Sequence, residues 1–235
     1  NVIDDLDSKS FFNKESNLQL LENIRFFEGE KANCKDLGAK LASLGDIYVF
    51  DAFGTAHREQ ASTHSAIECA PVACAGLLLQ RENKFLSLAL NNHESPYVAV
   101  IGGAKASSKL ELIKHINSEA DHIIVGGGIA NTFLKAKGFD VGKSLFEDSM
   151  IDIAYNLIEK GKIILPKKVI TSTTFEGKNV KKTLVSEVGH NEMILDLHLE
   201  EETVALLEDA KTILWNGPMG VFENIDFEKG TKDLS

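Results

Sequence analysis

Short apolar runs and longer amphipathic segments alternate through the second half of the chain. The apolar runs are four or five residues long and lie at 97–101, 122–125, 162–165 and 212–215. Runs of this length without polar alternation are typical of strands that a sheet buries on both faces. Such strands, separated by helical segments, predict a parallel sheet covered by helices.

Three segments between these runs are predicted to be helical, and the last of them has the apolar spacing of an amphipathic helix. They extend over 107–116, 126–137 and 150–160. Gly138 and Gly161 follow the last two segments, as expected where helices end. The order of strand, helix and strand therefore repeats along this half of the chain.

The first 70 residues have a similar pattern, with strands predicted at 18–26 and 47–53 and a helix at 34–44. Between the halves, residues 71–92 have the pattern of one long helix that begins with a proline. A helix that joins two α/β units places a cleft between them, and its ends are natural hinge points. The predicted fold class is therefore α/β, with two units joined by a hinge helix.

Three of the predicted strands end in glycine-containing turns, with glycines at 102–103, 126–128 and 217. The carboxyl ends of parallel strands meet at one edge of the sheet, and ligands bind beyond that edge. Glycine also lets the backbone approach phosphate oxygens closely where a helix begins. These turns predict a nucleotide-sized site.

Two lysines, Lys105 and Lys109, follow the first glycine turn. They are four positions apart, so on a helix that starts here both ammonium groups lie on one face. Cations at a helix N-terminus are unfavourable unless an anion lies between them, which favours a polyphosphate ligand. The alternative is a pair of solvated surface lysines.

Arginine is rare, because Arg25, Arg58 and Arg81 are three of 25 basic residues. Arg25 and Arg58 follow strand-like runs. A chain that uses lysine for most of its positive charge is expected to keep arginine where a planar guanidinium group must bind a carboxylate or a phosphate with two hydrogen bonds. The alternative is that the composition alone makes arginine scarce and that both are ordinary surface residues.

Composition excludes several classes of protein. Hydrophobic residues make up 43% of the chain, enough for a core, and no apolar run approaches the length of about 18 residues that a membrane span needs. A net charge of −10 argues against nucleic acid but not against a small anion. The polar, acidic start indicates no signal peptide, and three unpaired cysteines fit a reducing cytoplasm. Both ends are interpreted as points inside a longer chain.

The sequence only partly matches two familiar nucleotide-binding motifs. Gly142-Lys143-Ser144 ends like a Walker loop, but Lys137 stands where the first glycine is required. The turn at 126–131 has the first two glycines of a dinucleotide fingerprint and Asn131 in place of the third, which disfavours a dinucleotide-dependent oxidoreductase. Glu223, after the last glycine turn, is interpreted equally as a ribose ligand or as a solvated acid.

Five segments, 20–26, 51–58, 102–105, 126–128 and 215–223, together resemble the phosphoglycerate kinase family in order and approximate spacing. The resemblance extends from about residue 18 to the end of the chain. It implies two Rossmann-like parallel-sheet domains joined by a hinge helix. The first domain, part of the 3-phosphoglycerate domain, would comprise residues 1–70, the hinge helix 71–95, and the incomplete nucleotide domain 96–235.

The resemblance also implies roles for individual residues. Arg25 and Arg58 would hold 3-phosphoglycerate beside the backbone of Gly54. Lys105 would be the catalytic residue that contacts the transferred phosphoryl group and also binds nucleotide, and Lys109 would bind the nucleotide phosphates. The remaining implied nucleotide-binding residues are Gly102, Gly103, Ala104, Gly126, Gly127, Asn216, Pro218 and Glu223.

The family's N-terminal Asp-x-Asn motif and its C-terminal Gly-Gly-Gly-Asp turn do not occur in this chain. Mg²⁺ is expected with ATP or ADP, but its protein ligand is expected outside these residues, so no metal ligand is assigned here. The segment 195–199 has His198 where the family usually has a Gly-Pro pair, which leaves the role of this loop at the adenine edge open.

The expected function is reversible phosphoryl transfer between ATP and 3-phosphoglycerate, giving ADP and 1,3-bisphosphoglycerate in glycolysis. The expected protein is a cytoplasmic monomer that binds neither nucleic acid nor membrane. The alternative is a non-catalytic nucleotide-binding fragment of such an enzyme, and we expect the 235 residues alone to show no turnover.

Overall fold

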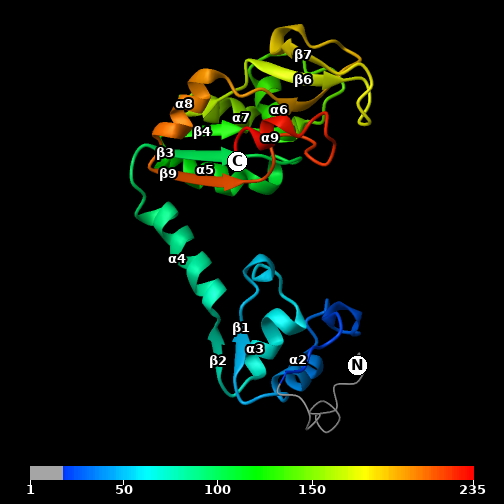
Figure 1. Ribbon diagram of the computed structural model, residues 1–235, viewed down its shortest axis with the longest axis vertical. Helices are drawn as coiled ribbons and strands as arrows, with labels where there is room; N and C mark the ends of the chain where they lie inside the picture. The colour runs from blue at the N-terminus through cyan, green and yellow to red at the C-terminus, as the bar shows by residue number, and fades with distance from the viewer. Residues whose placement is uncertain (1–17) are drawn as a thin grey trace. The chain divides into compact units, whose positions relative to one another are not determined.

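The computed structural model describes residues 18–235 (Figure 1). The chain divides into two compact units, and the boundary lies between Ser87 and Leu88. Helix α4 (Leu77–Asn91) contains this point of division. The domain boundaries at residues 70 and 95, and the role of this helix as a hinge, stay predictions. Among the described residues, no helix has the length and apolar character that crossing a membrane requires.

The first unit is a small α/β unit with a two-stranded parallel sheet, in which β1 (Tyr48–Phe50) pairs with β2 (Ala73–Ala75). Its core is formed by buried apolar residues of helical segments, namely Leu37, Leu41, Ala61 and Ala66. The other elements of this unit are a 3₁₀ turn η1 (Ile24–Phe26), α2 (Lys35–Ala42), a 3₁₀ turn η2 (Phe53–Thr55), a π-helical turn η3 (Ala61–Ser65) and α3 (Ala66–Cys69).

Two predictions for this unit are wrong in part. The strand predicted at 18–26 is absent; Asn23 accepts a hydrogen bond from Arg25 N at 3.1 Å and so starts η1 instead. The predicted helix at 71–92 begins only at Leu77, because the short apolar run before it pairs with β1. Asp51 then accepts a hydrogen bond from Leu79 N at 2.7 Å, which satisfies one of the free N–H groups of the helix start.

The second unit is built on a four-stranded sheet with the order β5-β4-β3-β9, in which every pair is parallel. Its strands are β3 (Tyr97–Ile101), β4 (His122–Val125), β5 (Ile163–Ile164) and β9 (Thr212–Asn216). The helices are η4 (Ser107–Lys109, a 3₁₀ turn), α5 (Leu110–Glu119), α6 (Gly127–Ala136), η5 (Asp148–Met150, a 3₁₀ turn), α7 (Ile151–Ile158), η6 (Val185–Glu187, a 3₁₀ turn), α8 (Glu201–Asp209) and α9 (Lys229–Lys232).

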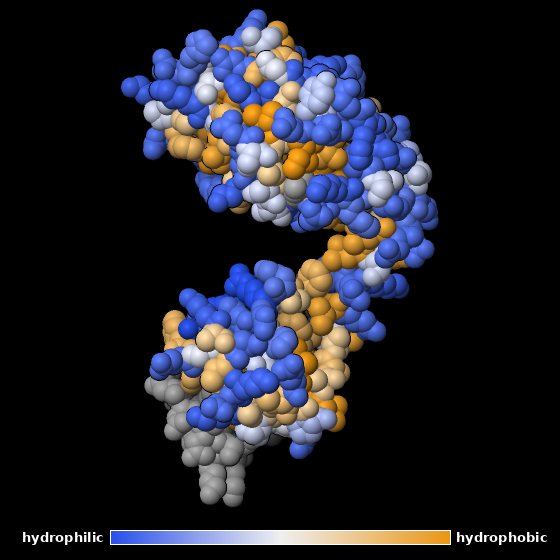
Figure 2. All heavy atoms as spheres, turned by 180° about the vertical axis from the view of Figure 1, so that it is seen from behind, coloured by the Kyte–Doolittle hydropathy of each residue, from blue (hydrophilic) through white to orange (hydrophobic). Residues whose placement is uncertain are grey.

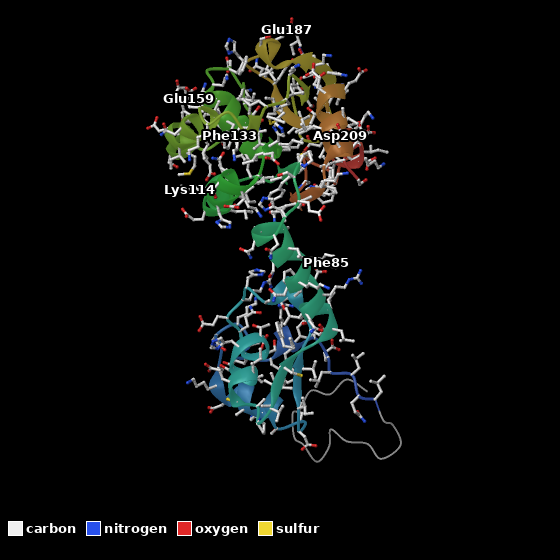
Figure 3. All side chains as sticks on the ribbon, turned by 90° about the vertical axis from the view of Figure 1, so that its left-hand side faces the viewer. Phe85, Lys114, Phe133, Glu159, Glu187 and Asp209 are labelled. Carbon is white, nitrogen blue, oxygen red and sulfur yellow. The ribbon has the colours of Figure 1, made fainter. Side chains whose placement is uncertain are left out.

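The central strand β3 is fully buried, and its side chains divide between two hydrophobic clusters. Tyr97, Ala99 and Ile101 pack with residues of α5, α6 and α7, whereas Val98 and Val100 pack toward α8. Figure 3 shows Phe133 of α6 within this unit, while Lys114 and Glu159 lie at its outside. The predicted α/β fold with a parallel sheet between helices is therefore confirmed.

A second, three-stranded sheet lies in the same unit and was not predicted. Its order is β7-β6-β8, both pairs are antiparallel, and its strands are β6 (Lys168–Ser172), β7 (Lys181–Leu184) and β8 (Met193–Leu197). Val169 and Ile194 pack with Leu134 of α6, so the small sheet is joined to the helical layer. Two of the four residues of β7 are lysines, and β6 begins with a lysine, so neither strand is a simple apolar run in the sequence.

Helix α4 carries uncovered apolar side chains. Leu77 and Phe85 are 82% and 57% exposed, and Leu78 and Leu88 are also exposed. Figure 2 shows hydrophobic surface along this helix. An apolar stripe of this kind is typical of a helix that packs against another segment.

Candidate active site

The turns after β3, β4 and β9 meet at the carboxyl edge of the four-stranded sheet. Gly102 N donates to the carbonyl oxygen of Asn216 at 2.9 Å, and Gly127 N donates to that of Met219 at 2.7 Å. Ile129 N donates to the carbonyl oxygen of Gly103 at 3.2 Å. These backbone bonds bring three segments that are far apart in sequence into one rigid cradle.

Glycine is required at two positions of this cradle for contact between the turns. A Cβ at residue 102 would lie 1.9 Å from the carbonyl oxygen of Pro218. Gly127 has a φ of +62°, and a Cβ there would lie 2.7 Å from the carbonyl oxygen of Gly103. The glycine pattern therefore has a structural cause in addition to any ligand.

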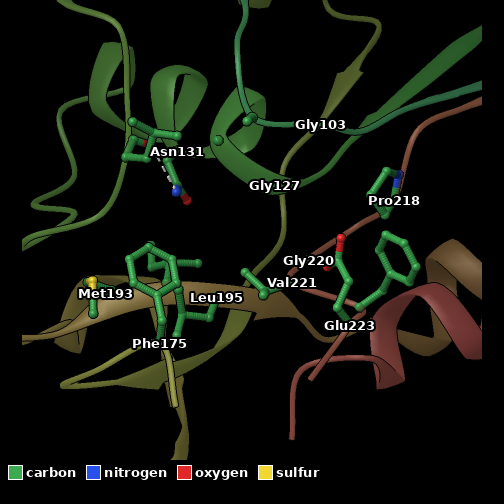
Figure 4. A pocket seen from close by; sticks show the side chains of 15 residues that line it. Gly103, Gly127, Asn131, Phe175, Met193, Leu195, Pro218, Gly220, Val221 and Glu223 are labelled. Carbon is green, nitrogen blue, oxygen red and sulfur yellow. Dashed lines mark hydrogen bonds between the residues drawn. The ribbon is translucent and has the colours of Figure 1, made fainter. Parts of the chain in front are cut away.

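A pocket of about 260 Å³ lies in front of these turns (Figure 4). Five of the predicted nucleotide-binding residues line it, namely Gly103, Ala104, Gly127, Pro218 and Glu223. Gly102 and Gly126 are buried behind it, because they pack against Pro218 and Met219. Gly128, from the glycine turn that predicted the site, also lines the pocket, although it was not among the assigned ligands. The sequence analysis assigned no ligand role to the other lining residues, namely Asn131, Leu145, Phe175, Met193, Ile194, Leu195, Gly220, Val221 and Phe222.

The missed residues give the pocket an apolar floor opposite the glycine turns. Figure 4 shows Phe175, Met193 and Leu195 on the side of the small antiparallel sheet, facing the turns that carry Gly103 and Gly127. Apart from the short apolar run at 193–195, the sequence has no local pattern that marks this floor, because its residues come from separate loops and strands. A flat, apolar ligand group fits between such walls.

Lys109 does not line this pocket, but it is joined to the end of β9, whose following turn does. Its Nζ donates a hydrogen bond to Oδ1 of Asn216, two residues before Pro218. The structure thus brings together two residues that the sequence analysis assigned to nucleotide phosphates. Lys105 is exposed, and no carboxylate of residues 18–235 lies within ion-pair distance of it.

The predicted placement of the two lysines on one helical face is wrong. Lys105 precedes the 3₁₀ turn η4, and α5 begins only after Lys109. The serines between them cause this difference, since Ser108 Oγ donates to the carbonyl oxygen of Lys105 at 2.8 Å. Hydrogen bonds of this type compete with a regular helix.

Glu147 holds the turn that carries Lys105. Its carboxylate accepts hydrogen bonds from Ser107 Oγ at 2.6 Å and from Ser107 N at 2.7 Å. These bonds, helped by the charge of Lys105, lower the pKa of Glu147 below its ordinary value. Sequence analysis gave no role to Glu147, since it is far from the turn along the chain.

The segment that ends with Glu223 is held by β8, to which α9 is also joined. Val221 N donates to the carbonyl oxygen of Leu195 at 2.8 Å, and Gly230 N donates to Oδ2 of the buried Asp196 at 2.7 Å. Burial raises the pKa of Asp196 to about 6. Glu223 itself is exposed at the pocket.

The segment 195–199, whose role at the adenine edge was open, contributes only Leu195 to the pocket. His198 follows β8, and its N–H donates to the carbonyl oxygen of Lys168 at 3.1 Å. Burial lowers the pKa of His198 below its ordinary value. His198 is therefore not among the residues that line this pocket.

The predicted 3-phosphoglycerate ligands lie in the first unit. Arg25 is in η1, Gly54 is in η2, and Arg58 follows η2; all three are exposed. Within the described part of the chain, neither guanidinium group forms an ion pair. A Cβ at Gly54 would meet no atom within 4 Å, so open space lies beside its backbone.

The fold and the pocket define an α/β protein whose pocket lies beyond the carboxyl edge of a parallel sheet, where such folds bind ligands. The family model "Phosphoglycerate kinase" matches residues 3–235. The chain belongs to the phosphoglycerate kinase family, which confirms the resemblance found in the sequence.

Relatives named phosphoglycerate kinase include one from Baumannia cicadellinicola subsp. Homalodisca coagulata. It is 47% identical over 236 residues, which are 100% of this chain and 60% of the relative. Another, from Francisella tularensis subsp. novicida (strain U112), is 46% identical over 231 residues, covering 94% of this chain and 59% of the relative. The chain thus spans about 60% of the length of these relatives.

Solved structures lead to the same family. The phosphoglycerate kinase from Coxiella burnetii is 44% identical, with a TM-score of 0.73 over 92% of this chain and 58% of that one. The enzyme of the same name from Pyrococcus horikoshii OT3 is 29% identical, with a TM-score of 0.77 over 94% of this chain and 61% of that one.

Proposed function

We propose that the protein carrying this chain is a phosphoglycerate kinase in activity, which transfers a phosphoryl group reversibly between ATP and 3-phosphoglycerate. The proposal depends above all on the Lys109–Asn216 pair at the edge of a pocket walled by glycine turns. The family and the structural relatives support it.

In this proposal the nucleotide base lies against the apolar floor of the pocket, and Glu223 accepts a hydrogen bond from a ribose hydroxyl. The phosphates extend toward Lys109, whose ammonium group Asn216 orients. Gly103, Ala104 and Gly127 form the facing wall. Arg25 and Arg58 bind the phosphate and carboxylate of 3-phosphoglycerate, with the backbone of Gly54 beside the substrate.

Phosphoryl transfer needs positioned reactants and positive charge more than covalent chemistry. Lys105 suits this role, because it is exposed and lies on a turn that Glu147 holds in place. Its charge would meet the oxygens of the transferred group. We therefore assign Lys105 as the catalytic residue.

Mg²⁺ is proposed only as the ion that accompanies the phosphates of ATP and ADP, whose charge it would neutralise. No three His, Cys, Asp or Glu residues within 18–235 form a group that could hold a metal ion. The carboxylate of Glu147, which holds the Lys105 turn, already accepts two hydrogen bonds from Ser107. The protein ligand of the metal is proposed to lie outside this chain.

The test is a coupled assay of the protein as its gene encodes it. ATP consumption that depends on 3-phosphoglycerate supports the proposal, and ADP binding without turnover supports a non-catalytic nucleotide-binding protein instead. Arg25→Ala and Arg58→Ala should raise KM for 3-phosphoglycerate, while Arg81→Ala serves as the matched control. Sedimentation and cell fractionation test the further expectation of a cytoplasmic monomer.

A further inference from the structure

Asn131 places a polar group in the apolar part of the pocket. The residue belongs to α6 and is 2% exposed. Its Nδ2 donates to the carbonyl oxygen of Leu145 at 3.1 Å. Its Oδ1 is buried and has no hydrogen-bond partner among the described residues. A buried acceptor without a partner costs stability, so a fold that retains one leaves room for an external donor to satisfy it.

The orientation of this amide is determined by its surroundings. Exchanging the oxygen and nitrogen would place Oδ1 against the carbonyl oxygen of Leu145, where two acceptors would repel each other. The nitrogen therefore stays on Leu145 and the oxygen faces the pocket. Figure 4 shows this amide pointing into the pocket, above Phe175.

The adjacent polar residue behaves differently. Thr132 Oγ1 donates to the carbonyl oxygen of Gly128 at 2.9 Å and accepts from Glu147 N at 3.2 Å. Its hydrogen bonds are thus made within the protein. The free acceptor at Asn131 is therefore a property of that side chain and not of the whole helix turn.

The proposed function places a purine base between the glycine turns and the apolar floor. We propose that Oδ1 of Asn131 accepts a hydrogen bond from the exocyclic amine of adenine, which makes Asn131 a specificity-determining residue. A 6-oxo purine presents an acceptor at the same place, and the two oxygens would repel each other. A site built around a hydrogen bond discriminates against analogues that lack it, because its polar group is then left unpaired.

The test compares three nucleotides by calorimetry on the 235-residue chain. ADP has the amine, purine riboside 5′-diphosphate lacks it, and inosine diphosphate has an oxygen in its place. We expect ADP to bind about tenfold more tightly than the riboside diphosphate, as for one hydrogen bond, and the inosine nucleotide to bind most weakly. Asn131→Leu should remove the preference and bring ADP to the affinity of the riboside diphosphate.

Asn117→Leu is the matched control, because Asn117 is also buried with an unpartnered Oδ1 but does not line the pocket. It should leave the preference unchanged. Equal binding of the three nucleotides by the unmutated chain, or an unchanged preference in Asn131→Leu, would overturn the inference while leaving the proposed function intact. Failure of all three nucleotides to bind would overturn both.

Discussion

Lys109 donates a hydrogen bond to Asn216, a residue 107 positions further along the chain. The bond joins the start of α5 to the end of β9, so the two sides of the proposed phosphate site are fixed together. The ammonium group has two further N–H donors, which remain for phosphate oxygens. The pair therefore prepares the site for an anion before one binds.

Lys109→Ala should weaken ADP binding about tenfold or more, because a charge-assisted contact contributes roughly 1.5–3 kcal/mol. Asn216→Ala should have a smaller effect, and its effect should shrink in the Lys109→Ala background, since Asn216 acts partly by orienting that lysine. Calorimetry measures all four combinations. Lys114→Ala, an exposed lysine paired with Glu111, is the control. Unchanged ADP affinity in Lys109→Ala would remove the residue from the site.

Lys105→Ala should act on catalysis more than on binding. In the protein as its gene encodes it, we expect kcat to fall on the order of 10²-fold, with a much smaller change in KM for ATP, because the charge that Lys105 meets develops during transfer. Steady-state kinetics with varied ATP separate the two effects. A higher KM with an unchanged kcat would instead make Lys105 a binding residue.

Sequence alone predicted most of the parallel sheet, because its strands lie in short, mostly apolar runs, and glycine directly follows the two buried strands β3 and β4. β3 and β4 have the predicted bounds. The helix at 107–116 was misplaced at its start, since the bonds of Ser107 and Ser108 are invisible to apolar spacing. The β7-β6-β8 sheet was missed because its strands are short and contain polar residues, with two lysines in β7 and Asp196 in β8.

Some residues of the candidate site could be predicted from the sequence, and others could not. Its glycine turns and charged residues form local motifs, so they could be found from the sequence. Phe175 and Leu145 could not, because each comes from a separate loop and only the fold brings them together. Asn131 was seen only as a residue that breaks a dinucleotide fingerprint. Its free acceptor becomes evident from its bond to Leu145.

Gly54→Ala is expected to change substrate binding but not stability, whereas Gly102→Ala is expected to lower stability. A Cβ at residue 54 would meet no atom within 4 Å, so the free energy of unfolding should change by less than about 0.5 kcal/mol. KM for 3-phosphoglycerate should rise, because the added methyl group would lie where the substrate is proposed to contact this backbone. A Cβ at residue 102 would collide with the backbone of Pro218, and a loss of stability of about 2 kcal/mol or more is expected. Denaturant unfolding and substrate kinetics test the pair. An unaltered KM in Gly54→Ala would contradict the assignment of Gly54.

Asp196 should make stability depend on pH. Its carboxyl group is 1% exposed, and burial raises its pKa from 3.8 to about 6. The folded state therefore binds a proton more tightly than the unfolded state does. The contribution of this group to the free energy of unfolding should fall as pH rises from about 4 to 6, by about 2–3 kcal/mol in total.

Asp196→Asn tests this directly, since an amide can still accept the hydrogen bond from Gly230 N. The variant should be more stable than the unmutated chain above pH 6, and its stability should change less between pH 4 and 6. Thermal unfolding across this range measures both effects, with Asp209→Asn, at the end of α8, as an exposed control. If Asp196→Asn shows the same pH dependence as the unmutated chain, the raised pKa of Asp196 in the folded protein is contradicted.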